Sequence, residues 1–159
     1  MTLVWCCSNL FANFKFEDLT CAQPPAEKGV YVIKIKNKNN VSPNTMVNKT
    51  HALISKLGWR LVQDFIMDRV NRLKNIEDCP IIYIGSAGFQ RGSRNTLIGR
   101  YTEFSGRHTI MYPIWVLLYF GWKLEFGWKV CDDPKLEEDQ LKKQYKKLHS
   151  GKLPALVSR

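Results

Sequence analysis

Two short segments each place a tyrosine beside a glycine on an expected β-strand. The first is Gly29-Val30-Tyr31 and the second is Tyr83-Ile84-Gly85. A phenol can position water or an anion, and it can accept a proton once ionised, although a free tyrosine has a pKa of about 10. A strand tyrosine is more often a packing residue with its hydroxyl at the surface. Either segment alone is therefore explained by packing.

The segment Leu97-Ile98-Gly99-Arg100-Tyr101 places an arginine at the border of a helical face. Leu97 and Tyr101 are four residues apart and are expected to face the core. Arg100 then has two interpretations. It can cover the core with its aliphatic stem, or its guanidinium can bind a phosphate through two N–H groups.

A carboxylate lies on the inward face of the last expected helix. The residues that share this face follow spacings of 4, 3, 4 and 3: Pro134, Glu138, Leu141, Tyr145 and Leu148. Glu138 can be a partner of the helix dipole or a ligand for a hard divalent cation. Glu137 lies four residues before Leu141, so spacing alone leaves both carboxylates open.

The chain is strongly basic, with 24 Lys and Arg against 14 Asp and Glu and a net charge of +10. This excess favours a polyanionic partner, either nucleic acid or an anionic membrane surface. The candidate phosphate contacts are Arg91, Arg94, Arg107, His108 and Lys142, together with Lys143, Lys146 and Lys147. Such contacts set position and affinity rather than sequence choice.

Length and composition predict one folded domain over residues 1–159, because 45% of the residues are hydrophobic. The five cysteines form no CxxC pair and are odd in number, which favours thiols in a reducing compartment over disulfides or zinc. No signal peptide is expected in residues 1–16, and no apolar run is long enough to span a bilayer. We expect a soluble, cytoplasmic protein.

The elements that position these residues follow from periodicity and capping. Residues 1–28 are an irregular lead-in, and residues 36–50 and 85–95 are loops. The expected strands are 30–35, 80–84 and 123–130. The expected helices are 51–74, 96–104, one after Ile110 with Pro113 in its first turn, and one from the N-cap Asp133 to Gly151.

Residues 115–120 fit a strand as well as a helix. In helix 51–74 the expected core face contains Ile54, Leu57, Leu61, Phe65, Val70 and Leu73.

Together these segments resemble the GIY-YIG nuclease family, from about residue 29 to residue 154. Gly29-Val30-Tyr31 is similar to the family's first motif, and Tyr83-Ile84-Gly85-Ser86-Ala87 to its second. Leu97-x-x-Arg100 resembles the arginine helix. Glu138-Asp-Gln-Leu141-Lys-Lys resembles the glutamate segment, which selects Glu138 over Glu137.

The resemblance implies an α/β fold of the α+β type. A small antiparallel sheet of about three strands would be flanked by helices, with an inserted helix within residues 36–78. It implies a metal-dependent endonuclease that cuts DNA, with duplex DNA as the expected substrate. Glu138 would hold one Mg²⁺ or Mn²⁺, Arg100 would stabilise the phosphate, Tyr31 would take a proton from water, and Tyr83 would place water or phosphate.

The chain departs from the family pattern in three places. Tyr83 follows Tyr31 by 52 residues, which is farther than is usual in the family. Phe104 replaces a histidine that often follows the arginine, and Val157 stands where the family usually has an asparagine. The alternatives are a catalytically silent nucleic-acid-binding module of the same fold and a protein-interaction domain that uses the insertion.

Overall fold

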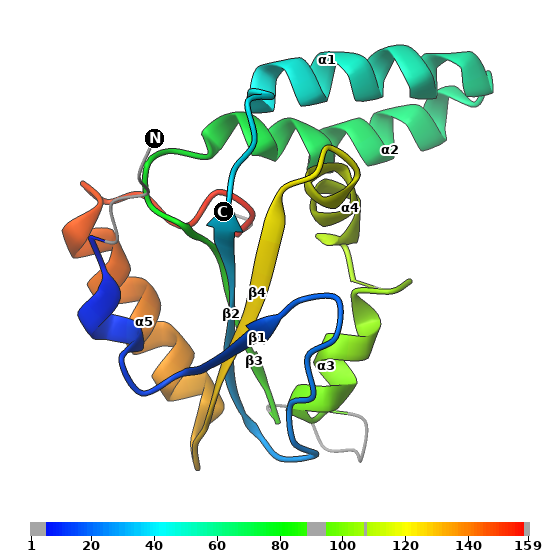
Figure 1. Ribbon diagram of the computed structural model, residues 1–159. Helices are drawn as coiled ribbons and strands as arrows, with labels where there is room; N and C mark the ends of the chain where they lie inside the picture. Colours follow the sequence, from blue (N-terminus) through cyan, green and yellow to red (C-terminus); the bar gives the residue numbers. More distant parts are fainter. Residues whose placement is uncertain (1–5, 89–94, 107, 158–159) are drawn as a thin grey trace.

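A four-stranded antiparallel sheet forms the centre of the computed structural model, which describes residues 6–88, 95–106 and 108–157 (Figure 1). The strand order is β1-β4-β2-β3. The strands are β1 (Lys15–Asp18), β2 (Gly29–Asn37), β3 (Ile81–Ala87) and β4 (Lys123–Val130). This confirms the α+β class with its antiparallel sheet.

Five α-helices surround the sheet in the described part of the chain: α1 (Pro43–Ile54), α2 (Arg60–Val70), α3 (Leu97–Glu103), α4 (Met111–Tyr119) and α5 (Pro134–Leu148). The short 3₁₀ helices are η1 (Ser8–Phe11), η2 (Ser55–Leu57) and η3 (Asn71–Asn75). Figure 1 shows α3 and α4 on one side of the sheet, α5 on the other, and α1 and α2 as a hairpin across one end.

Alternation along the strands divides the core between the two faces of the sheet. One apolar cluster contains Tyr31 and Ile33 of β2 with Phe126 of β4, and α3, α4 and the α1–α2 hairpin pack against it. The second contains Val30 and Val32, which α5 covers with Leu141 and Tyr145.

The region between β2 and β3 was predicted only in part. The expected loop 36–50 is wrong in its second half, because α1 begins at Pro43 with Ser42 as its N-cap. A Ser-Pro pair read as a loop is equally a helix start, since proline fits the first helical position. A single helix over 51–74 is also wrong. Gly58, with φ of 73°, ends η2 before α2 begins.

The core face assigned to that helix is wrong at three positions. Leu57, Leu61 and Phe65 are 59%, 86% and 46% exposed, whereas Val70 and Leu73 are buried. Because the chain turns at Gly58, residues at helical spacing on either side of it do not share one face. A face extended from α1 into α2 therefore includes solvent-exposed residues.

The ends of the other elements differ less from expectation. The lead-in 1–28 contains β1, which pairs with β4 and adds a fourth strand to the sheet. β3 extends to Ala87, into the expected loop 85–95. Residues 115–119 belong to α4, a helix, and α5 begins after Asp133 as expected. None of the helices in the described ranges combines the length and apolar character needed to cross a membrane.

Candidate functional site

The two motif tyrosines lie against each other on neighbouring antiparallel strands. Tyr31 of β2 and Tyr83 of β3 have ring centroids 5.9 Å apart, with planes inclined by 30°. Tyr31 pairs across the sheet with Gly85, and Ile33 pairs with Tyr83. The two phenols are therefore diagonal neighbours on the sheet.

A β-bulge in β3 sets the direction of Tyr83. Ile33 pairs with Tyr83 but Lys34 pairs with Ile81, so Ile82 is an extra residue without a partner in the register. A bulge of this kind changes which face the following side chains take. It brings both Ile82 and Tyr83 to the cluster that contains Tyr31.

Gly85 provides the space that the Tyr31 ring occupies. A Cβ at Gly85 would lie 2.7 Å from the hydroxyl oxygen and Cζ of Tyr31, and 2.8 Å from Cε1 of Tyr83. These distances are well below ordinary contact. The glycine of the second motif therefore lets both tyrosines pack here.

Gly85→Ala should destabilise the protein by about 1–3 kcal/mol, the usual cost of an added methyl group in a filled core. Denaturant unfolding measures this. Gly106→Ala is the matched control, because no atom lies within 4 Å of a Cβ at that position. Equal stability of the two variants would contradict the packing described for Gly85.

Burial makes both tyrosines weak acids. Tyr31 is 2% exposed, and burial raises its pKa well above the usual value, with further raising by Tyr83. Tyr83 is less enclosed. Burial raises its pKa as well, but the contact with Tyr31 lowers it, as do the charges of Arg100 and Arg72. Tyr83 is thus the phenol with more groups that favour its ionised form.

His108 contacts both tyrosines. Its Nε2 lies 3.4 Å from the Tyr31 hydroxyl, and its ring packs edge-on to Tyr83 at 5.5 Å. Burial lowers the pKa of His108 to about 4, so the ring is neutral at neutral pH. Because Nδ1 accepts the Ile110 amide N–H at 3.2 Å, the proton of the neutral ring lies on Nε2 and is donated to Tyr31.

Arg100 lies on the same face as the tyrosines, on α3, which Thr96 caps. Its Nη1 donates to Glu103 at 2.9 Å. Its Nε is buried and has no hydrogen-bond partner among the described residues. Its charge lowers the pKa of both Tyr31 and Tyr83, although burial outweighs it. A buried donor without a partner is a place where an acceptor from outside can bind.

Glu138 approaches from the other face of the sheet. It is 8% exposed on α5 and accepts a hydrogen bond from Ser86, near the end of the edge strand β3, while Lys142 pairs with its second oxygen. Its charge raises the pKa of both tyrosines, again after burial as the main cause. Tyr31, Tyr83 and Arg100 thus share one face, whereas Glu138 lies on the α5 side and acts on the two tyrosines through its charge.

Glu138 and Glu137 differ in their surroundings. Glu137 is half-buried and pairs with Lys129 at 2.7 Å. Glu138 is a carboxylate in a mainly protein environment with a hydroxyl and a cation beside it. This carboxylate could hold a Mg²⁺ ion, completed by water and phosphate oxygens, once Lys142 gives up its ion pair.

The predicted phosphate contacts have different outcomes. Arg91, Arg94 and Arg107 lie outside the described residues. Lys142 forms an ion pair with Glu138. His108 lies beside the tyrosines, but as a neutral ring rather than as a cation.

Sequence reasoning missed three polar neighbours of the site: Arg72, Ser86 as the partner of Glu138, and Glu103 as the partner of Arg100. Arg72 comes from η3 in the insertion, and its charge acts on Tyr83. No local pattern marks Arg72 as a site residue. Ser86 directly follows the second motif and could have been singled out.

Comparison of the chain with protein-family models, curated proteins and solved structures found no match.

Proposed function

We propose that this protein is a metal-dependent endonuclease of the GIY-YIG type that hydrolyses phosphodiester bonds in DNA. One observation carries the proposal. Tyr31 and Tyr83 stack on each other on neighbouring strands, Arg100 of α3 has a buried Nε without a partner, and the charges of Arg100 and Glu138 both act on the two phenols. Packing alone explains the tyrosines, but it does not explain a buried arginine Nε without a partner or a buried carboxylate whose charge acts on both phenols.

Arg100 is the proposed phosphate ligand. Its unpartnered Nε and its Nη groups would donate to two oxygens of one phosphate, and Glu103 would give up part of its pairing. Guanidinium charge at this point stabilises the negative charge that grows on phosphorus in the transition state.

We assign the proton transfer from water to Tyr83 and a positioning role to Tyr31. This reverses the roles that the family resemblance implies. Tyr31 is nearly inaccessible, and its hydroxyl accepts a hydrogen bond from His108. Tyr31 can then donate to Tyr83, which favours the phenolate there. The raised pKa of Tyr83 means that a further positive charge must be present before it ionises near neutral pH.

Glu138 is the proposed ligand of a single Mg²⁺ or Mn²⁺. When bound, such an ion supplies positive charge to the phosphate and to the leaving oxygen. Ser86 orients the carboxylate by donating to one of its oxygens. Lys142 neutralises the carboxylate in this structure and is free to turn to a phosphate when another cation takes its place.

The substrate class follows from charge. A net charge of +10 favours a polyanion, and Arg72 and Lys142 place part of that charge beside the site. We propose duplex DNA as the substrate and the cytoplasm as the location. The odd number of cysteines and the lack of a CxxC pair favour a reducing compartment.

A second candidate function is a protein-interaction domain, which exposed apolar side chains on the insertion favour. Leu57, Trp59 and Leu61 are 59%, 73% and 86% exposed around the turn between α1 and α2. Such side chains mark protein contacts when they form a contiguous patch. This function and the nuclease use different surfaces.

Incubation with supercoiled plasmid DNA tests the proposal. With Mg²⁺ or Mn²⁺ the protein should convert the plasmid to nicked and linear forms, and an excess of chelator should stop the conversion. DNA binding without cleavage under every divalent ion would support the silent module. Neither binding at low salt nor cleavage would support the protein-interaction domain.

A further inference from the structure

Three cysteines and a histidine meet at the N-terminal end of the described chain, away from the tyrosine site. Cys6, Cys7, Cys79 and His149 each offer one ligand atom, and these atoms all lie within 4.8 Å of one another. Cys7 Sγ is 3.3 Å from Cys79 Sγ, and Cys6 Sγ is 3.5 Å from His149 Nε2.

The four residues come from three separate parts of the fold. Cys6 and Cys7 precede η1, Cys79 precedes β3, and His149 follows α5. Cys7 and Cys79 are buried, Cys6 is exposed and His149 is half-buried. The chain therefore brings together residues up to 143 positions apart at one point.

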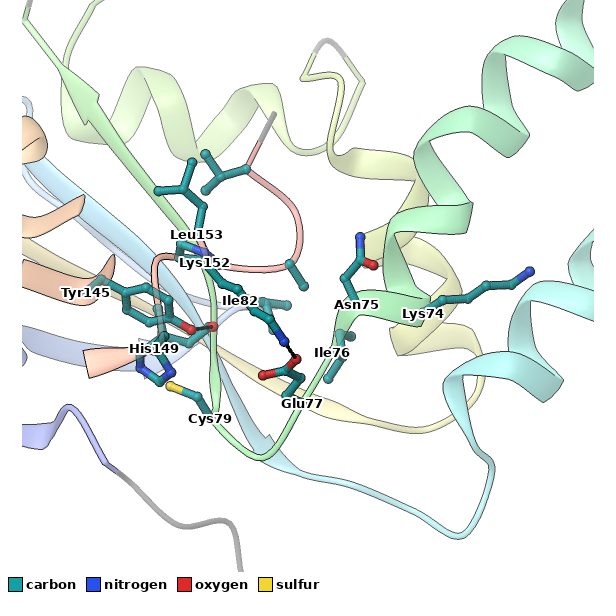
Figure 2. A pocket seen from close by; sticks show the side chains of 14 residues that line it. Lys74, Asn75, Ile76, Glu77, Cys79, Ile82, Tyr145, His149, Lys152 and Leu153 are labelled. Atoms are coloured by element: carbon teal, nitrogen blue, oxygen red, sulfur yellow. Dashed lines mark hydrogen bonds and ion pairs between the residues drawn. The ribbon is translucent and has the colours of Figure 1, made fainter. Parts of the chain in front are cut away.

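The imidazole is held in place by its surroundings. The His149 ring stacks on Tyr145 with centroids 3.9 Å apart and planes inclined by 19°. The Tyr145 hydroxyl donates to the Ile81 carbonyl at 3.4 Å, next to Cys79 (Figure 2). A cavity of about 330 Å³ also borders Cys79, Tyr145 and His149, so an ion can reach the cluster from solvent. Fixed rings and an approach from solvent are both features of protein metal sites.

The donor set selects a soft or borderline cation. Three thiolates and one imidazole suit Zn²⁺ and exclude Mg²⁺ and Mn²⁺ as preferred ions, since those favour oxygen. In a tetrahedral zinc site with Zn–S bonds of about 2.3 Å, ligand sulfurs lie about 3.8 Å apart. The separations in the cluster bracket that value, so small side-chain shifts suffice.

We propose that Cys6, Cys7, Cys79 and His149 form a structural Zn²⁺ site of the Cys₃His type. Four protein ligands complete a tetrahedral shell and leave no open position for a substrate. The ion ties the N-terminal segment to the start of β3 and the end of α5. The thiols lose their protons on binding, and the zinc–thiolate bonds replace the contact between Cys7 and Cys79.

Metal analysis of the purified full chain tests this site. We expect about one zinc per chain after purification with a reducing agent, and zinc-stripped protein should take up Co²⁺ with the visible bands of a tetrahedral thiolate site. Chelator should lower Tm in the parent protein. Absence of both zinc and the Co²⁺ bands would overturn the proposal, as would a stable metal-free Cys7–Cys79 disulfide.

Two matched serine variants make the test specific. Cys6→Ser removes an exposed ligand, so the fold should survive while zinc retention against a chelator falls by more than about tenfold. Cys21→Ser, also at an exposed cysteine, should keep the parent's retention. Equal retention in the two variants would remove Cys6 from the site. Glu138→Gln should also keep the zinc, so this test is independent of the proposed nuclease activity.

Discussion

Tyr83→Phe should reduce plasmid cleavage by about 10²–10⁴-fold, the usual contribution of a positioned acid or base. Phenylalanine keeps the ring that stacks on Tyr31 and removes only the hydroxyl. Unfolding free energy should change by no more than about 1.5 kcal/mol, the contribution of a typical hydrogen bond. Initial rates of nicking, with unfolding curves on the same preparations, give both values.

Tyr31→Phe is the comparison that separates the two roles. Tyr31 is buried, and its proposed role is to donate a hydrogen bond to Tyr83. Loss of the Tyr31 hydroxyl should therefore reduce cleavage less than Tyr83→Phe does. The opposite order would assign the proton transfer to Tyr31, as the family resemblance implies. Unchanged rates in both variants would show that the phenols only pack.

The parts of the fold with strong local signals could be predicted from the sequence. β4 has the expected bounds, and α5 begins after Asp133 because a capping aspartate and a following proline are independent helix-start signals. The inward position of Glu138 also followed from helical spacing, since Leu141 and Tyr145 are buried on the same face. Leu148, expected on that face as well, is wrong: it is 54% exposed at the end of the helix.

Other parts depend on tertiary contacts that leave no local pattern. β1 is four residues long and carries charges at three of them, so only its pairing with β4 identifies it as a strand. The approach of Arg72 to Tyr83 depends on the path of the insertion. The Ile82 bulge likewise could not be read from an apolar run.

The cysteine cluster shows the same limit of sequence reasoning. Cys6 and Cys7 are adjacent, and Cys79 lies 72 residues after Cys7, so no zinc spacing is present in the sequence. The gathering of three thiols and an imidazole appears only when α5 packs beside η1.

Glu138→Gln should reduce cleavage by about two to three orders of magnitude. Removing the charge that holds the divalent ion loses several kcal/mol of transition-state stabilisation, and each 1.36 kcal/mol of activation free energy changes the rate about tenfold. Glutamine keeps the shape of the side chain and can still accept the Ser86 hydrogen bond. DNA affinity should stay equal or increase, because one negative charge near the phosphates is lost.

Glu137→Gln is the matched control on the same helix. It also breaks an ion pair, with Lys129, but it lies outside the proposed site. Cleavage of supercoiled plasmid by the parent protein and both variants, with binding measured on the same DNA, is the most direct test of a metal-dependent nuclease centred on Glu138. The account predicts cleavage by the parent and Glu137→Gln, and binding with almost no cleavage by Glu138→Gln. Equal cleavage by all three proteins would contradict it.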